Sequence, residues 1–193
     1  MSTTGRPPES VRKPADRRVS RTRRSIDEAF IALLERRGYE AVGVSDIVRE
    51  ADVGRATFYE HYTCKDDLLR AQLQRVSSLL RAHPGRPEFL DAMPLFAHVR
   101  DVPLLYRLVA GRSAAARSLR ILQEVLQARV AEVLEEHLGT GAALRPPLTP
   151  SIASRVIVAD LAALLAWWAE NGMAAAADEM QRLFLACAGS LFA

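Results

Sequence analysis

In the first third of the chain, side chains that donate hydrogen bonds lie at short, helix-like spacings. Tyr59, His61 and Lys65 carry a phenol, an imidazole and an ammonium group, separated by two and four residues. On a helix these groups can reach one stretch of a phosphate backbone, and such contacts position a duplex without reading its sequence. The spacing predicts phosphate binding, whereas Phe58, Tyr62 and half of Tyr59 are expected in the core.

The sequence contains no arrangement typical of catalysis. His83, His98 and His137 are isolated, Glu135 and Glu136 fit a solvated helix face, and no GxGxxG or GxxxxGK motif is present. Catalysis by side chains needs a nucleophile with a base, or paired carboxylates, or a phosphate loop. We therefore expect a protein that is not an enzyme.

Metal and disulfide sites are not expected either. Cys64 and Cys187 are far apart and belong to no CxxC or Cys/His pattern, and no second ligand lies one helical turn from His61. Two separated cysteines fit a reducing cytoplasm. The N-terminus lacks the apolar segment of a secretory signal. These features predict a cytoplasmic protein without metal or cofactor.

Charge is concentrated at the N-terminus. Residues 1–24 carry eight Arg or Lys against two acidic residues, a net of +6, so the rest of the chain carries about −3 of the total of +3. Residues 1–20 contain several prolines and show no hydrophobic periodicity, which predicts a disordered basic arm. Such an arm could grip phosphates by releasing counterions, or it could serve only as a solubilising tail.

Three helices must position the candidate phosphate-binding residues. Residues 21–37 place one apolar stripe on a helix that Gly38 can end, and 44–51 and 55–62 predict two shorter helices. Residues 52–54 are too few for anything but a tight turn, and Asp52 tolerates left-handed geometry. The order of helix, short turn and polar helix is that of a DNA-binding helix-turn-helix.

The segment VSDIVREADVGRATFYEHYTCKDDLL, residues 44–69, closely resembles the DNA-binding signature of the tetracycline-repressor (TetR) family. The resemblance covers about 50 residues and implies that 55–62 is the recognition helix. It further implies that Arg55, Ala56 and Thr57 lie near base edges or groove-wall phosphates, and that Tyr59, His61 and Lys65 contact phosphates. Ser45 and Arg24 complete the expected DNA-binding residues.

Three positions depart from the family pattern. Asp52 stands where Gly is usual, Gly54 where Ser often caps the recognition helix, and Cys64 where Ser often caps the fourth helix. A lost cap costs about 1 kcal/mol or less. None of these departures removes an expected DNA contact.

The remaining two-thirds of the chain also predicts helices. Hydrophobic residues make up 49% of the chain and charged residues 25%, the usage of a folded soluble protein. Further helices are expected at about 65–82, 87–99, 102–110, 113–138, 150–171 and 175–192, and no useful strand alternation is present. The prediction is an all-α fold of about nine helices, with a DNA-binding domain at 21–69 and a helical ligand-binding and dimerisation domain at 70–193.

The last two predicted helices favour a homodimer. Val156–Ala169 is apolar almost all round but too short, at 14 residues, for the roughly 20 that span a bilayer. Covering that surface with a second copy gives a two-fold four-helix bundle, although a helix pair within a monomer is the alternative. Cys187 is then expected as a buried small hydrophobe. The expected interface residues are Val156, Leu164, Trp167, Leu185, Ala188 and Phe192.

The family pairs its DNA-binding module with a variable domain that often holds a small-molecule pocket. Aromatic and adaptable residues on the corresponding helices are candidates for lining it, although helically spaced aromatics are more often core. They are Phe89, Met93, Phe96, His98, Tyr106 and Trp168. The resemblance implies a ligand-responsive repressor that binds a palindromic DNA operator as a homodimer and responds to a small-molecule effector. A helical adaptor that uses the helix-turn-helix for protein contacts, or less readily an enzyme, is the alternative.

Overall fold

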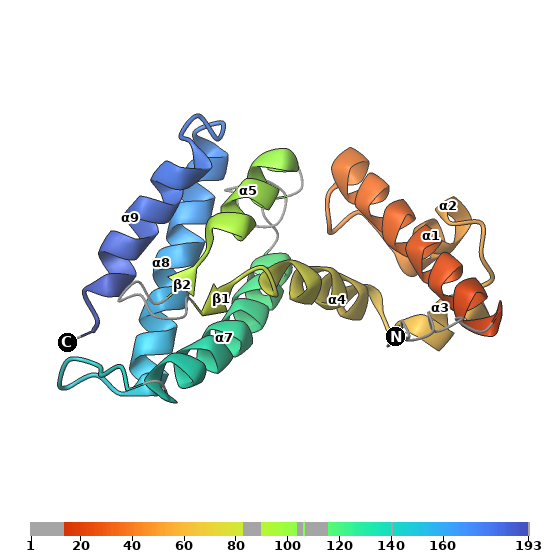
Figure 1. Cartoon of the computed structure of the whole chain (residues 1–193). Helices are drawn as coiled ribbons and strands as arrows, with labels where there is room; N and C mark the ends of the chain where they lie inside the picture. The colour runs from red at the N-terminus through yellow and green to blue at the C-terminus, as the bar shows by residue number, and fades with distance from the viewer. Residues whose placement is uncertain (1–13, 83–89, 104–105, 107–115, 140, 193) are drawn as a thin grey trace, which may run out of the picture.

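The computed structural model describes residues 14–82, 90–103, 106, 116–139 and 141–192. Its helices form two groups that α4 (Lys65–Ser77) joins (Figure 1). One group comprises α1 (Pro14–Arg37), α2 (Val44–Glu50) and α3 (Arg55–His61). The other comprises α5 (Met93–Asp101), α7 (Ala116–Gly139), α8 (Pro150–Glu170) and α9 (Ala177–Gly189). The prediction of an all-α fold with an N-terminal helix-turn-helix is confirmed.

Helix α1 follows the predicted apolar stripe but starts earlier than expected. Ile26, Phe30 and Leu34 are buried, and Gly38 ends the helix with a φ of +73°. The helix begins at Pro14 rather than at 21, so the last part of the expected disordered arm is helical. Proline suits a first helical turn because its missing N–H has no intrahelical partner there. Residues 1–13 lie outside the described part of the chain.

Helix α4 ends at Ser77, before the predicted end at 82. The hydroxyls of Ser77 and Ser78 donate to the carbonyls of Gln74 and Arg75, at 3.0 and 2.7 Å, so they compete for the last helical acceptors. The chain then forms β1 (Arg81–Ala82), which pairs antiparallel with β2 (Leu90–Asp91). The expectation of no strand is wrong at these two short segments.

Helix α5 begins at Met93, later than the predicted start at 87. The Asp91 carboxylate accepts from the Met93 backbone N–H at 3.1 Å, and Pro94 occupies the first turn. The described residues contain eight helices. The additional helix expected at 102–110 falls mostly outside them, although Tyr106 itself is described and buried.

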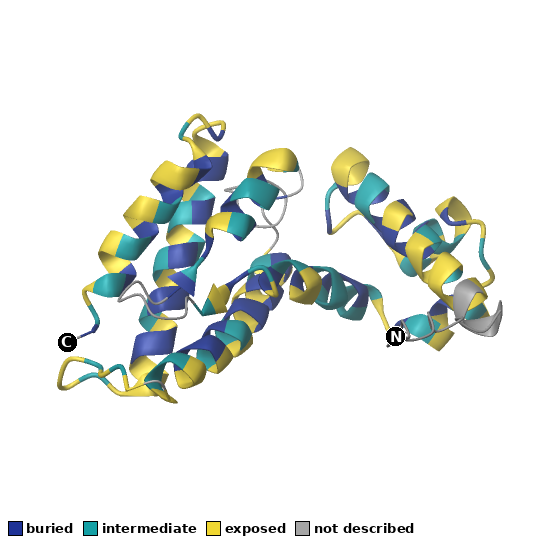
Figure 2. Cartoon of the chain, in the orientation of Figure 1, coloured by how far each residue is buried: buried dark blue, intermediate teal, exposed yellow. Residues whose placement is uncertain are grey.

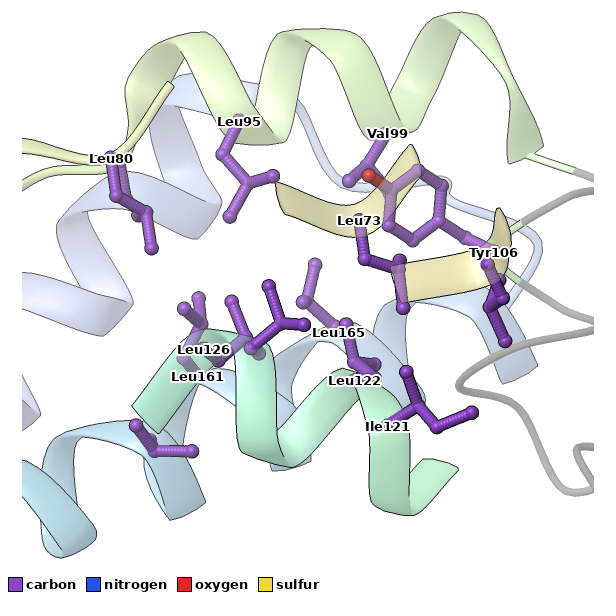
Figure 3. Close-up of a cluster of buried hydrophobic side chains, with 14 of the residues drawn as sticks. Leu73, Leu80, Leu95, Val99, Tyr106, Ile121, Leu122, Leu126, Leu161 and Leu165 are labelled. Carbon is purple, nitrogen blue, oxygen red and sulfur yellow. The ribbon is translucent and has the colours of Figure 1, made fainter. Parts of the chain in front are cut away.

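The core of the C-terminal group lies among α4, α5, α7 and α8. Leu73 of α4, Val99 of α5, Leu122 of α7 and Leu165 of α8 converge in one cluster, and the Tyr106 side chain reaches into it (Figure 3). Because α4 also buries Leu68 and Leu69, it belongs to the cores of both groups. A shift of α4 would therefore change the packing in the cores of both groups.

Helix α8 has a buried side and an exposed side. Ile157, Leu161 and Trp168 are fully buried, whereas Ile152 and Trp167 are about half exposed. Buried and exposed stretches alternate along this helix in Figure 2. Of the described helices, α8 alone is long and apolar enough to cross a membrane, and 44% of its apolar window is buried inside the protein. A helix with a buried side of this kind is the core helix of a folded domain.

Candidate nucleic-acid interface

The turn between α2 and α3 has the geometry that the sequence predicts. Asp52 adopts a φ of +51°, and the backbone N–H of Val53 donates to Val48 at 3.1 Å. Phe58 and Tyr62 are buried, as expected, and hold α3 against the rest of the N-terminal group. Anchoring one side of α3 leaves its other side free.

The free side of α3 carries the polar residues expected to contact DNA. Arg55, Ala56 and Tyr59 are exposed, and Thr57 is partly exposed. The Arg55 guanidinium lies 3.4 Å from the hydroxyl of Ser45 and 3.5 Å from that of Tyr59. Ser45, at the exposed start of α2, therefore shares one surface with the start of α3.

The candidate phosphate contacts are not equally free. His61 is partly exposed at the end of α3. Lys65 Nζ donates to the backbone carbonyl of Tyr39 at 2.8 Å and lies 4.2 Å from the centre of its ring. The same ammonium group therefore also holds α4 to the segment before α2. The phosphate contact of Lys65 stays a prediction, because two of its three hydrogens remain for a phosphate.

Arg24 is exposed on α1. Together with Ser20, Arg23 and Arg75 it lines a shallow surface hollow. The position of Arg24 fits a phosphate contact. Arg23 has a different task, because its Nε donates to the Tyr62 hydroxyl at 3.0 Å. Both residues belong to the basic stretch that sequence reasoning treated as one group.

A polar network around the buried Asp27, which sequence reasoning missed, holds α1 and the end of α3 to α4. The Tyr62 hydroxyl donates to Asp27 Oδ1 at 2.7 Å, and Arg75 reaches Asp27 Oδ2 at 2.8 Å. Burial and the hydrogen bond to Asp27 raise the pKa of Tyr62. The only sequence signal was Asp27, a charged residue beside the apolar stripe of α1.

At the starts of α2 and α4, where the N-cap residue makes no side-chain hydrogen bond, a carboxylate from the first turn of the helix accepts a backbone hydrogen bond instead. Gly43 offers no side chain at the start of α2, but its backbone N–H donates to Asp46 Oδ2 at 3.0 Å. That hydrogen bond and the ion pair with Arg37 lower the pKa of Asp46. At α4, Asp67 accepts from the Thr63 backbone N–H at 2.9 Å, next to the uncapped Cys64. Both helices therefore start at defined residues.

The model of the bacterial regulatory proteins of the tetR family matches residues 26–71, which include the whole of this surface on α2 and α3. Residues 26–71 therefore form a DNA-binding segment of the tetR type. The HTH-type transcriptional regulator YxbF of Bacillus subtilis is 45% identical to this chain over 64 residues, which are 33% of this chain. That match spans 17% of the length of YxbF.

Solved structures of TetR regulators share the whole fold. A regulator from Streptococcus agalactiae is 21% identical, with a TM-score of 0.60 over 89% of this chain and 96% of that one. TylP from Streptomyces fradiae is 20% identical, with a TM-score of 0.66 over 91% of this chain and 88% of that one. At these identities the likeness concerns the fold alone, which includes the helical C-terminal group.

The structure separates the residues expected to form a ligand pocket. Phe96 and Trp168 are fully buried and pack edge to face, with ring centres 5.9 Å apart. They fill the core, and Met93 is exposed on the surface. His98 and Tyr106 do line a cavity. Phe96, Trp168 and Met93 do not line this cavity, so their part in ligand binding stays a prediction. Phe89 lies outside the described residues.

The expected dimer residues also divide. Ala188 and Phe192 are buried within the protomer, so they cannot form an interface as predicted. Trp167 is 50% exposed, and Val156, Leu164 and Leu185 are partly exposed. Cys187, expected to be buried, is exposed. Helix α9 is thus rotated relative to the prediction, with Leu183 rather than Ala188 facing outward.

The described residues contain no group of three or more side chains that could hold a metal ion.

Proposed function

We propose that this protein is a TetR-family DNA-binding repressor that acts as a homodimer on a palindromic operator and is released by a small-molecule effector. One observation carries the proposal: the exposed side of α3 presents Arg55, Thr57 and Tyr59 together, while Phe58 and Tyr62 anchor the other side. A recognition helix needs this division, because its polar side enters the major groove as a rigid unit.

The charges of the N-terminal group support DNA binding. Arg24 and Tyr59 are exposed, and Lys65 keeps two ammonium hydrogens for a phosphate beyond the one that Tyr39 accepts. Residues 1–13 add Arg6, Arg12 and Lys13, with Glu9 as the only acidic residue. Each phosphate neutralised contributes about −0.9 to the slope of log affinity against log salt.

The exposed apolar residues support a homodimer. Of the large hydrophobic side chains that are exposed in the described chain, Ile152, Trp167 and Leu183 lie on α8 and α9 (Figure 2). Two copies related by a two-fold axis would cover them in a four-helix bundle. The two recognition helices would then meet half-sites about one helical turn apart.

The position of α4 supports the proposed effector response. This helix packs in both cores, so a ligand that favours another placement of α4 changes the separation of the two recognition helices. Effector and operator must then weaken each other's binding by the same factor.

Selection of a random DNA library with the purified protein, followed by bandshifts at several salt concentrations, tests the proposal. We expect a palindromic consensus and a steeply negative slope of log affinity against log salt. A flat salt response without an enriched sequence would instead favour an adaptor that uses the helix-turn-helix for protein contacts.

A further inference from the structure

A cavity of about 180 Å³ lies where the two helical groups meet. Phe30 and Leu34 of α1 form one wall and Leu69 of α4 contributes to the floor, while His98 and Tyr106 come from the C-terminal group. In Figure 1, α1 and α5 face each other above α4, the helix whose residues Leu69 and Gln72 also line the cavity. The buried rings of Phe96 and Trp168 are not part of it.

The walls are almost entirely apolar and include several rings. His98 and Tyr106 pack edge to face with ring centres 6.2 Å apart, and burial raises the pKa of the Tyr106 phenol. An apolar cavity of about 150 Å³ in another protein accommodates one benzene ring. The space beside Phe30 therefore suits a ligand with a single aromatic ring.

One polar group lies in this apolar lining without a partner. Gln72 lines the cavity, and its amide nitrogen Nε2 is shielded from solvent with no hydrogen-bond partner among the residues that the structure describes. A shielded donor without an acceptor is costly, so an oxygen supplied by a ligand would gain more here than at the surface. Gln72 thus defines the polar end of the occupant.

We propose that this cavity binds an uncharged single-ring aromatic compound that carries a carbonyl or hydroxyl oxygen, with the oxygen accepting from Gln72 Nε2. The ring would pack between Phe30 and Leu34 on one side and His98 and Tyr106 on the other. Charged rings are disfavoured, because the lining is almost entirely apolar and its two ionic side chains, Glu35 and Arg75, belong to solvent-exposed residues, with Arg75 already paired to Asp27.

The occupant would contact both helical groups at once. On one side it would touch Phe30 and Leu34 of α1, and on the other His98 and Tyr106 of the C-terminal group. The regulatory meaning of this site rests on the proposed function, since a compound held between the groups biases the placement of the recognition helix. Binding of the compound itself does not depend on DNA and can be measured without it.

The test uses the full chain and isothermal titration calorimetry with two probes of equal shape. Acetophenone carries a ring and a carbonyl, and α-methylstyrene replaces the carbonyl oxygen by a CH₂ group. We expect acetophenone to bind with a Kd of about 1 mM or tighter. Gln72→Leu should weaken acetophenone roughly fivefold to tenfold and leave α-methylstyrene unchanged or tighter, because one hydrogen bond is lost.

Gln74→Leu is the matched control, since Gln74 lies on the same helix but is exposed and outside this cavity. It should change neither affinity. Val76→Phe introduces a ring from α4 into the cavity and should weaken both probes at least tenfold. If Gln72→Leu melts early, Gln72→Met tests the same loss of the amide with an unbranched chain.

Three results would overturn the proposal: no binding of acetophenone to the wild-type protein, equal loss of both probes in Gln72→Leu, or retained binding in Val76→Phe. Binding without any effect on the affinity for the selected operator would keep the site and refute its regulatory role. Failure of the DNA selection, by contrast, would count against the proposed function and leave the site standing.

Discussion

Arg117, near the start of α7, forms an ion pair with Asp66, in the first turn of α4. Asp66 also accepts a hydrogen bond from the Tyr39 hydroxyl. Burial acts to raise the pKa of Asp66, but the bonds from Tyr39 and Arg117 outweigh it and the pKa lies below its usual value. One carboxylate thus links the segment before α2, the start of α4 and the C-terminal group.

Breaking this ion pair should loosen the junction without unfolding the protein. We expect Arg117→Leu to lower the melting temperature by about 1–3 °C at low salt, and by less at high salt, because exposed pairs are weak and screened. Thermal unfolding followed by circular dichroism measures both conditions. Arg120→Leu is the control on the same helix, since Arg120 is also exposed. Equal shifts for the two variants would remove any special role for Arg117.

The two tyrosines of α3 and its C-terminal cap should separate stability from DNA binding. Tyr62→Phe removes a buried hydrogen bond to Asp27 and should destabilise the fold by about 1–3 kcal/mol. Tyr59→Phe removes an exposed hydroxyl, so it should leave stability unchanged and weaken DNA binding. Denaturant titration and bandshifts on both variants provide the comparison. A stability loss in Tyr59→Phe as large as that in Tyr62→Phe would contradict the assignment.

Local periodicity was enough to predict α1, α2, α3 and the turn at Asp52, because a stripe of apolar residues and a left-handed position depend on near neighbours. The orientation of α9 could not be predicted in this way. Its sequence runs through Ala186, Cys187 and Ala188, and residues one apart on a helix point about 100° apart, so similar small side chains do not indicate which one faces inward. The structure buries Ala188 and exposes Cys187.

The polar contacts between distant residues could not be predicted from the sequence, for a different reason. Lys65 bonds to Tyr39, and Arg75 pairs with Asp27, across separations at which no sequence spacing applies. The candidate cavity was likewise found only in part. His98 and Tyr106 were predicted as lining, whereas Gln72 was not among the predicted residues and those of α1 were predicted only as part of an apolar stripe.

A half-buried carboxylate on α8 gives a pH-dependent prediction. Burial raises the pKa of Asp160 above its ordinary value of 3.8, so the folded protein binds a proton that the unfolded chain releases in the window between those two pKa values. Asp160 therefore costs stability above this window and nothing below it. Asp160→Asn should raise the melting temperature at pH 7, and the gain should vanish as the pH falls to about 3.8. Glu170→Gln, an exposed change on the same helix, should show no such trend.

The dimer prediction moves from Ala188 to the exposed residues of α8 and α9. Trp167→Arg places a charge among the exposed apolar residues of α8 and α9. It should yield monomers by light scattering at micromolar concentration, with loss of operator binding. Met93→Arg is the matched control, because Met93 is also exposed and apolar but lies on α5. A wild-type protein that is monomeric, or a Trp167→Arg variant that stays dimeric, would rule out this interface.

In the proposed function, α3 reads DNA through its exposed N-terminal turn. Operator selection with wild type, Arg55→Ala, Thr57→Ala and Lys65→Ala examines this role. Arg55→Ala or Thr57→Ala should relax the preference at one symmetric pair of operator positions, each good base contact being worth about 1–3 kcal/mol of discrimination. Lys65→Ala should weaken binding to all sequences alike and leave the consensus unchanged. If Arg55→Ala and Thr57→Ala both lower affinity uniformly and relax no position, α3 is not the helix that reads the operator.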